Sequence, residues 1–201
     1  MRRLTALIKK IVPFPAEIQT EFSKIVKLLD LMPGEWIPDD LPTGTKIFVE
    51  EGFLLLTRHR GDRWRCINFY REGTTVIPRS KGAAEMQEGS LRIRAVEPSR
   101  IYYLTPDDER RVRATFPQYA LADHILRRRT FLKDVEKAMI LQYTPADRIL
   151  FVDRYFRSLL RAPLQDLVEF LGLKSELEKT LLEALQRKRL SPKRQLAEMH
   201  N

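Results

Sequence analysis

The chain has 201 residues, of which 43% are hydrophobic and 31% charged, so it can form one large or two small domains with a buried core. Its formal net charge of +9 favours a polyanionic partner such as nucleic acid, although a basic surface without a specific partner explains the charge equally well. The single cysteine, Cys66, excludes an intramolecular disulfide, and no apolar run is long enough for a transmembrane helix. We therefore expect a soluble, cytoplasmic protein.

The N-terminal segment is basic, and Lys9 and Lys10 interrupt its apolar residues. This pattern predicts a short amphipathic helix rather than a signal peptide. Over residues 3–32 the apolar spacing predicts amphipathic helices, broken at Pro13 and Pro15, that pack against a core.

Residues 34–104 are rich in Gly and Pro, with short apolar runs between them. Alternation of apolar and polar residues, clearest where Ile93 and Ala95 alternate with Arg92 and Arg94, predicts strands. Gly61 and Asp62 lie between two of these runs and predict a hairpin turn. The spacing is typical of a sandwich, a jelly roll or a small barrel. The expected strands are 46–49, 53–57, 65–70, 90–96 and 100–104.

Helical patterns follow the strands, up to a basic tail that begins at Arg187. Thr105 and Thr144 each precede a proline and predict capped helix starts, and the second helix is expected to run to about residue 160. Between them, residues 118–142 predict one helix of roughly 40 Å. Its apolar residues follow one face, which indicates a subunit interface, the alternative being packing within one domain. The interface residues expected are Leu121, Ile125, Leu132, Val135 and Met139.

Two short amphipathic patterns meet at Gly172. The first contains Leu164, Leu167, Val168 and Leu171, and the second contains Leu177, Leu181, Leu182 and Leu185. Two short helices joined by a turn with Gly are typical of a helix-turn-helix, whose second helix enters the DNA major groove.

This order of elements resembles the Crp/Fnr family of bacterial transcription regulators. The segments that carry the resemblance are 48–56, 68–73, 90–104, 143–148 and 162–172. The resemblance implies an α+β protein with three parts. They are an N-terminal double-stranded β-helix of jelly-roll, cupin-like type that acts as a sensor (1–117), a long dimerisation helix (118–143) and a C-terminal helix-turn-helix domain (144–201). The implied function is that of a homodimeric DNA-binding regulator.

The chain departs from the members of this family that bind cyclic nucleotides. Ile77 and Pro78 stand where those proteins have a Gly-Glu pair, and Gly89 stands near the place of their phosphate-binding arginine. Pro78 also removes a backbone N–H donor. We therefore expect no response to cyclic AMP, and the effector, if any, stays open. The side chains that could substitute as anion ligands are Arg79, Lys81 and Arg92.

The second helix of the helix-turn-helix also differs from the family pattern. Thr180 stands where an arginine is usual, and Glu176 and Glu178 would repel phosphates unless one accepts from a cytosine amino group. Lys174 and Gln165 are expected at phosphates, and Lys179 and Thr180 at bases. We expect no β-hairpin wing after Leu190, so a sensor or interaction module that has lost specific DNA binding is the alternative. The candidate DNA-binding residues are Gln165, Lys174, Ser175, Lys179 and Thr180.

Catalytic and cofactor patterns are missing from the sequence. There is no Gly-x-Ser-x-Gly, no His-Glu-x-x-His and no Gly-rich phosphate loop followed by Lys. One cysteine cannot build an iron–sulfur site, and the three histidines have no metal-ligand spacing. We therefore expect neither an enzyme nor a bound cofactor or metal.

Overall fold

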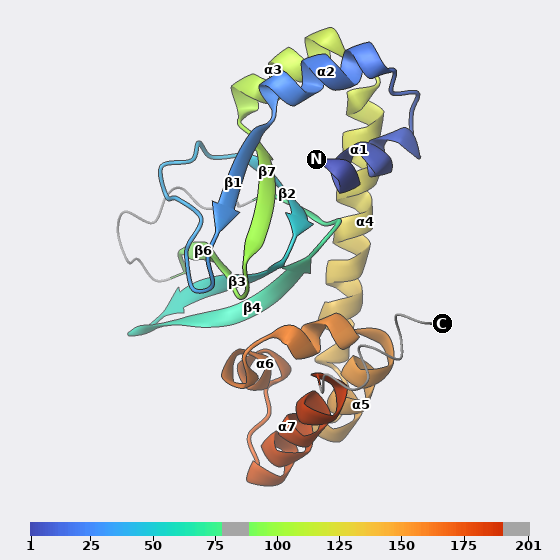
Figure 1. Ribbon diagram of the computed structural model, residues 1–201. Helices are drawn as coiled ribbons and strands as arrows, with labels where there is room; N and C mark the ends of the chain where they lie inside the picture. Colours follow the sequence, from blue (N-terminus) through green and yellow to red (C-terminus); the bar gives the residue numbers. More distant parts are fainter. Residues whose placement is uncertain (78–88, 191–201) are drawn as a thin grey trace. The chain divides into compact units, whose positions relative to one another are not determined.

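The computed structural model describes residues 1–77 and 89–190. The chain divides into two compact units, Met1–Asp134 and Val135–Asn201. The first unit holds two antiparallel sheets and the helices α1, α2 and α3, and the second unit is helical (Figure 1). Helix α4 (Tyr119–Ile140) begins in the first unit and ends in the second.

The first sheet has the order β1-β7-β2-β5 and the second has the order β4-β3-β6. Side chains from both sheets form one buried cluster that includes Ile47, Val49, Leu54, Ile93 and Ile101. The two sheets therefore share one apolar core. The strands are β1 (Lys27–Leu31), β2 (Lys46–Glu51), β3 (Phe53–Arg60), β4 (Arg63–Arg71), β5 (Thr75–Val76), β6 (Leu91–Ala95) and β7 (Ser99–Leu104).

The five strands expected from the sequence are confirmed as β2, β3, β4, β6 and β7. Ile93 and Ala95 of β6 are buried, as the alternation predicted. The predicted hairpin is also confirmed, because β3 and β4 pair up to Arg60 opposite Arg63, with Gly61 and Asp62 forming the turn. Period-2 patterning thus identified the strands that have one face in the core.

The helical prediction for residues 27–31 is wrong. The second N-terminal helix ends at Ile25, and β1 follows directly. This strand pairs with β7 along its whole length, from Lys27 opposite Tyr103 to Leu31 opposite Ser99. Backbone pairing with a strand about seventy residues away overrides the local helical spacing.

The helical segments of the first unit contribute most of the side chains of a second buried apolar cluster. Phe14 stacks on Phe116, and Phe22 packs against both Phe14 and Tyr119. The buried carboxylate of Glu50 in β2 accepts from the backbone N–H groups of α1 at its start, where a helix carries partial positive charge. The helices are α1 (Arg2–Lys9), α2 (Ala16–Ile25), α3 (Pro106–Thr115) and α4.

Local capping signals gave accurate helix starts. The Thr105 hydroxyl accepts from the N–H of Asp108, and the Asp108 carboxylate accepts from the N–H of Thr105, a reciprocal capping box. The Thr144 hydroxyl caps α5 (Pro145–Tyr155) by accepting from the N–H of Asp147. The break predicted at Pro117 is also confirmed, because it falls between α3 and α4.

The second unit contains α5 and three further helical segments. The helix expected to reach residue 160 ends earlier, at Tyr155, and continues after Phe156 as a short 3-10 helix. Ile149, Leu160, Leu167 and Leu182 are buried in this unit. The segments are α5 (Pro145–Tyr155), η1 (Arg157–Arg161), α6 (Leu164–Leu171) and α7 (Glu176–Leu190).

Candidate nucleic-acid interface

Helix α6 ends at Gly172, which turns the chain toward α7. Gly172 has φ +63°, a left-handed conformation that favours glycine. The N–H of Leu173 then donates to the carbonyl of Val168, and the N–H of Gly172 donates to the carbonyl of Glu169. Since Leu173 and Val168 are both buried, the turn is fixed by backbone hydrogen bonds and by apolar packing.

Arg148 of α5 stabilises the same turn from outside. Its Nη1 donates to the Leu171 carbonyl at 2.6 Å, its Nη2 to the Leu141 carbonyl at 2.7 Å and its Nε to the Tyr143 carbonyl at 2.8 Å. One guanidinium therefore satisfies carbonyls at the ends of both α4 and α6. Sequence reasoning did not assign this role, although Arg148 ends one of the segments that carry the family resemblance.

A capping box begins α7. The Ser175 hydroxyl accepts from the N–H of Glu178, and the Glu178 carboxylate accepts from the N–H groups of Ser175 and Lys174 at 3.1 and 3.0 Å. These backbone hydrogen bonds lower the pKa of Glu178, and the one from Ser175 has the larger effect. The acidic side chain that argued against DNA binding is therefore a helix cap.

The other predicted DNA-binding residues lie on α6, on the turn and on α7. Gln165 and Lys174 are exposed. Lys179 forms a 2.6 Å ion pair with Glu176, and the Thr180 hydroxyl donates to the Glu176 carbonyl at 2.8 Å. The structure thus brings these residues onto consecutive helical elements, with the polar groups of Lys179 and Thr180 engaged within α7 itself.

The exposed side of α7 differs from the apolar face predicted. Leu182 is buried, as expected, but the side chains of Leu177 and Leu181 are 70% and 50% exposed. The opposite side of the helix is anchored by the buried Gln186, whose Nε2 donates to the carbonyls of Leu160 and Ala162. The leucine spacing alone could not tell which side of α7 these contacts would bury.

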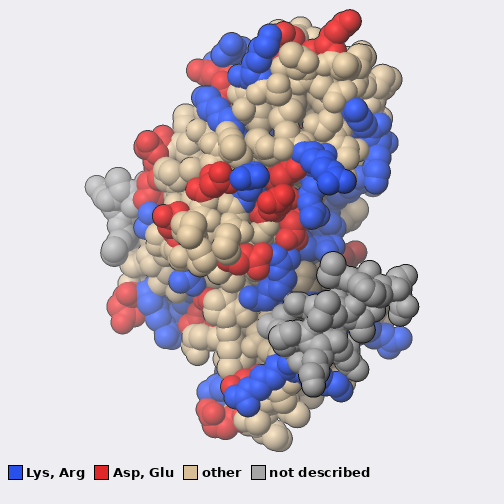
Figure 2. Space-filling model, in the orientation of Figure 1, with Lys and Arg blue, Asp and Glu red and all other residues tan. Residues whose placement is uncertain are grey.

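Both signs of charge appear on the face of the molecule that Figure 2 draws. On the face drawn in Figure 2, Lys and Arg are numerous, and Asp and Glu lie among them. The net charge of +9 therefore belongs to the chain as a whole. It would strengthen binding to a polyanion without selecting a sequence.

The apolar stripe predicted along α4 is largely exposed. Leu132 is 49% exposed and Met139 is 51% exposed, and Leu121 and Val135 are exposed as well. Ile125 is half-buried. A line of exposed apolar side chains along a 22-residue helix is the feature that a subunit interface needs.

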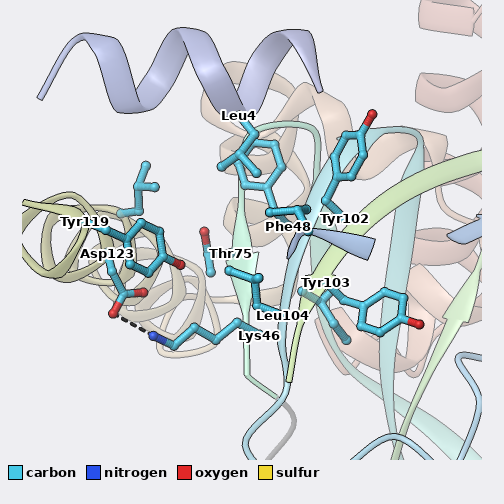
Figure 3. A pocket seen from close by; sticks show the side chains of 12 residues that line it. Leu4, Lys46, Phe48, Thr75, Tyr102, Tyr103, Leu104, Tyr119 and Asp123 are labelled. Carbon is cyan, nitrogen blue, oxygen red and sulfur yellow. Dashed lines mark hydrogen bonds and ion pairs between the residues drawn. The ribbon is translucent and has the colours of Figure 1, made fainter. Parts of the chain in front are cut away.

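A small cavity in the first unit lies among β2, β7, α1 and α4 (Figure 3). Its volume is about 20 Å³, enough for a water molecule but far below a small-molecule pocket. Lys46 and Asp123 point toward each other there, with their charged atoms 2.7 Å apart. Since Lys46 also pairs with Glu109 at 2.5 Å, its charge is neutralised by two carboxylates.

The ion cluster continues around Lys46. Arg113 pairs with Glu109 at 2.6 Å and with Asp123 at 3.2 Å, and Arg127 pairs with Asp123 at 2.7 Å. Burial acts to raise the pKa of Glu109, but hydrogen bonds from Lys46 and Arg113 outweigh it and hold the pKa below its usual value. The cluster joins β2, α3 and α4, and no sequence pattern pointed to it.

Arg92, the anion ligand suggested from the sequence, has other partners. It pairs with Asp39 at 2.7 Å and lies 4.7 Å from the ring of Trp36. Arg79 and Lys81 lie outside the described residues. Among residues 1–77 and 89–190, no His, Cys, Asp and Glu side chains gather in a group that could hold a metal ion. Within the same ranges, no helix is long and apolar enough to cross a membrane.

Comparison with known proteins shows a similarity of fold. No protein-family model matches the chain, and no curated protein matches its sequence. The structure is similar to that of FixK2 from Bradyrhizobium japonicum, with a TM-score of 0.59, 16% identity, and coverage of 81% of this chain and 85% of that one.

Two further structures resemble the chain. One is CLP, the c-di-GMP-responsive global regulator of Xanthomonas campestris, with a TM-score of 0.58, 17% identity and coverage of 88% and 94%. The other is CprK in complex with OCPA, with a TM-score of 0.55, 17% identity and coverage of 87% and 85%. All three are Crp/Fnr regulators, which confirms at the level of the fold the resemblance predicted from the sequence.

Proposed function

We propose that the chain is a dimeric, DNA-binding transcription regulator of the Crp/Fnr type. The observation that carries this proposal is the order of its parts: two antiparallel sheets, a long helix and then α6, the Gly172 turn and α7. The same fold is found in regulators of that family across more than four fifths of the chain.

In this proposal α7 enters the major groove with its exposed side toward the bases. Gln165 and Lys174 are exposed beside it and would contact phosphates, which fix position and orientation rather than sequence. The Ser175–Glu178 capping box and the Arg148 contacts hold α7 at the turn, so the helix is rigid before it meets DNA.

We further propose that α4 pairs with the α4 of a second copy. The exposed stripe of Leu121, Leu132, Val135 and Met139 would be covered in that dimer, together with the half-buried Ile125. Two α7 helices would then reach successive major grooves about 34 Å apart, on a site with two-fold symmetry.

The two-sheet unit would serve as the sensor or shape the dimer, but without cyclic AMP as its ligand. This rests on the sequence, in which Ile77 and Pro78 stand at the place of the Gly-Glu pair. An effector of another kind would act by binding two arrangements of the dimer with different affinity.

Selection of bound duplexes from a random DNA pool at physiological salt tests the DNA-binding function. We expect an enriched motif with two-fold symmetry. Ala184→Glu places a negative charge on the exposed side of α7 and should abolish the enrichment, because it repels phosphates. Ala146→Glu makes the same change on the exposed surface of α5 and serves as the matched control.

The alternative is a sensor or interaction module that uses this fold without specific DNA binding. It is favoured by Thr180, which stands where the family usually has an arginine. Weak, salt-sensitive binding without any enriched motif, equal for Ala184→Glu and Ala146→Glu, would support the alternative and contradict the proposed function.

A further inference from the structure

The outward side of α7 presents hydrocarbon where a DNA-reading helix usually presents polar groups. Leu177 and Leu181 lie one helical turn apart and are 70% and 50% exposed. Thr180 and Ala184 are also exposed on this side of the helix. We call Leu177, Thr180, Leu181 and Ala184 the outer face of α7.

Polar groups in the first turns of α7 have partners within the helix. Lys179 pairs with Glu176, and the Glu178 carboxylate accepts backbone N–H groups at the helix start. The Thr180 hydroxyl donates to the backbone carbonyl of Glu176. The outer face therefore offers mainly methyl and methylene groups, while the hydrogen-bonding groups nearby stabilise the helix.

Cationic side chains stand at both ends of this face. Lys174 is exposed just before α7, and Lys188 is exposed toward its end, where Arg187 pairs with Glu183 at 2.6 Å. A short apolar surface between cations suits a polyanion that carries apolar groups between its phosphates. Two leucines also supply far less than the roughly 800 Å² per partner that a standard protein–protein interface buries, which disfavours a protein occupant.

The DNA major groove contains one strongly apolar group, the C5-methyl of thymine. On the basis of the proposed function, we propose that α7 reads DNA by packing Leu177 and Leu181 against thymine methyl groups. The operator is then recognised by the positions of its thymines rather than by arginine contacts to guanine. Glu176 stays paired with Lys179, so its charge does not oppose the docking.

Replacing thymine with uracil in the DNA tests this inference directly, because uracil keeps the base pair and lacks only the methyl group. The full-length protein would be titrated with a fluorescent duplex carrying the selected motif, at one fixed salt concentration. Each contacted thymine changed to uracil should weaken binding about fourfold, the factor that corresponds to one buried methylene. Uracil at thymines outside the half-sites should have no effect.

Protein variants assign the methyl contacts to residues. In the double variant Leu177→Ala, Leu181→Ala, the ratio of thymine to uracil affinity should fall to about one, while salt-dependent binding persists. Leu150→Ala removes an exposed leucine of α5 and should leave the ratio unchanged. Circular dichroism should show native helix content in all variants, because each substitution replaces an exposed residue with a stronger helix former.

The outcomes separate this inference from the function on which it rests. If a motif is enriched and uracil is neutral at every position, the methyl contacts are wrong and the regulator function stands. If no motif is enriched, both proposals fail. If uracil leaves the DNA affinity unchanged and Leu177→Ala instead weakens binding to a purified protein partner, the outer face binds protein. This outcome also overturns the inference.

Discussion

The Nη1 of Arg148 donates a 2.6 Å hydrogen bond to the carbonyl of Leu171, the last residue of α6. The same side chain lies next to Gly172, where an added Cβ would meet Nη1 at 3.1 Å. The guanidinium therefore occupies the space beside the turn and satisfies the carbonyl that α6 leaves open. A side chain of α5 thus fixes the turn that leads into α7.

Replacing Arg148 should destabilise the turn between α6 and α7. Arg148→Met keeps much of the aliphatic stem but leaves three carbonyls without their donor, and we expect a loss of about 2–3 kcal/mol in the free energy of unfolding. DNA affinity should fall as well, since α7 is no longer held. Urea unfolding followed by circular dichroism measures the first effect and duplex titration the second. Arg154→Met, at an exposed position of α5, is the control, and equal behaviour of the two variants would contradict this role.

Gly52 should tolerate no side chain. It has φ +96°, and a Cβ there would lie 2.6 Å from the Cα of Ser99, a backbone atom that cannot yield without displacing β7. We expect Gly52→Ala to destabilise the first unit by about 3 kcal/mol, from backbone strain together with overlap. Trp36 and Trp64 both lie in this unit, so tryptophan fluorescence during urea unfolding reports the change.

Gly61→Ala separates strain from overlap. Gly61 has φ +66°, but nothing lies within 4 Å of the added Cβ. Its substitution should therefore cost about 1–2 kcal/mol, from the left-handed backbone alone. Equal losses at Gly52 and Gly61 would show that the contact with Ser99 does not matter.

Local signals predicted much of the fold because they act within a few residues. The caps at Thr105 and Thr144 and the hairpin at Gly61 depend on neighbours three or fewer residues away. Strand β1 was missed because its identity comes from pairing with β7, which no local pattern encodes.

The candidate site was predicted only in part, for the same physical reason. The turn at Gly172 follows from its own sequence, whereas the hydrogen bond from Arg148 to Leu171 joins residues 23 apart. Likewise, the pairing of Lys46 with Asp123 spans 77 residues. Leu177 and Leu181 have the spacing of core residues, and only the packing of α7 shows that they are exposed.

A charge in the α4 stripe should weaken the dimer. In Leu132→Glu, the carboxylate would face the apolar stripe of the second copy without a partner. We therefore expect the dissociation constant of the dimer to be at least tenfold higher than in the wild type. Sedimentation equilibrium over a range of protein concentrations measures this change. Ala138→Glu places the same charge on an exposed position of α4 outside the stripe and should leave the dimer intact. A wild-type protein that is monomeric at micromolar concentration would contradict the dimer model.

Because of the ion cluster around Lys46, the stability of the first unit should decrease at acidic pH. The pKa of Glu109 is lowered in the folded protein, despite its burial, by hydrogen bonds from Lys46 and Arg113. A carboxyl whose folded pKa lies below its unfolded value stabilises the protein above the unfolded pKa, and this stabilisation is lost as pH falls through the folded pKa. The loss should therefore begin near pH 4.5, the ordinary value for a glutamate, and continue below it.

Glu109→Gln should destabilise the protein at neutral pH but much less in acid. At pH 7 we expect it to be less stable than the wild type by about 1–2 kcal/mol, because Lys46 and Arg113 lose a charged acceptor. Between pH 5 and pH 3 the difference should shrink, since the wild type becomes protonated at the same site. Urea unfolding at each pH, followed by tryptophan fluorescence, measures both. A difference that stays constant across this range would contradict this role of Glu109. Asp108 would then be the next carboxyl to test, since hydrogen bonds from Thr105 and Lys27 also lower its pKa against the effect of burial.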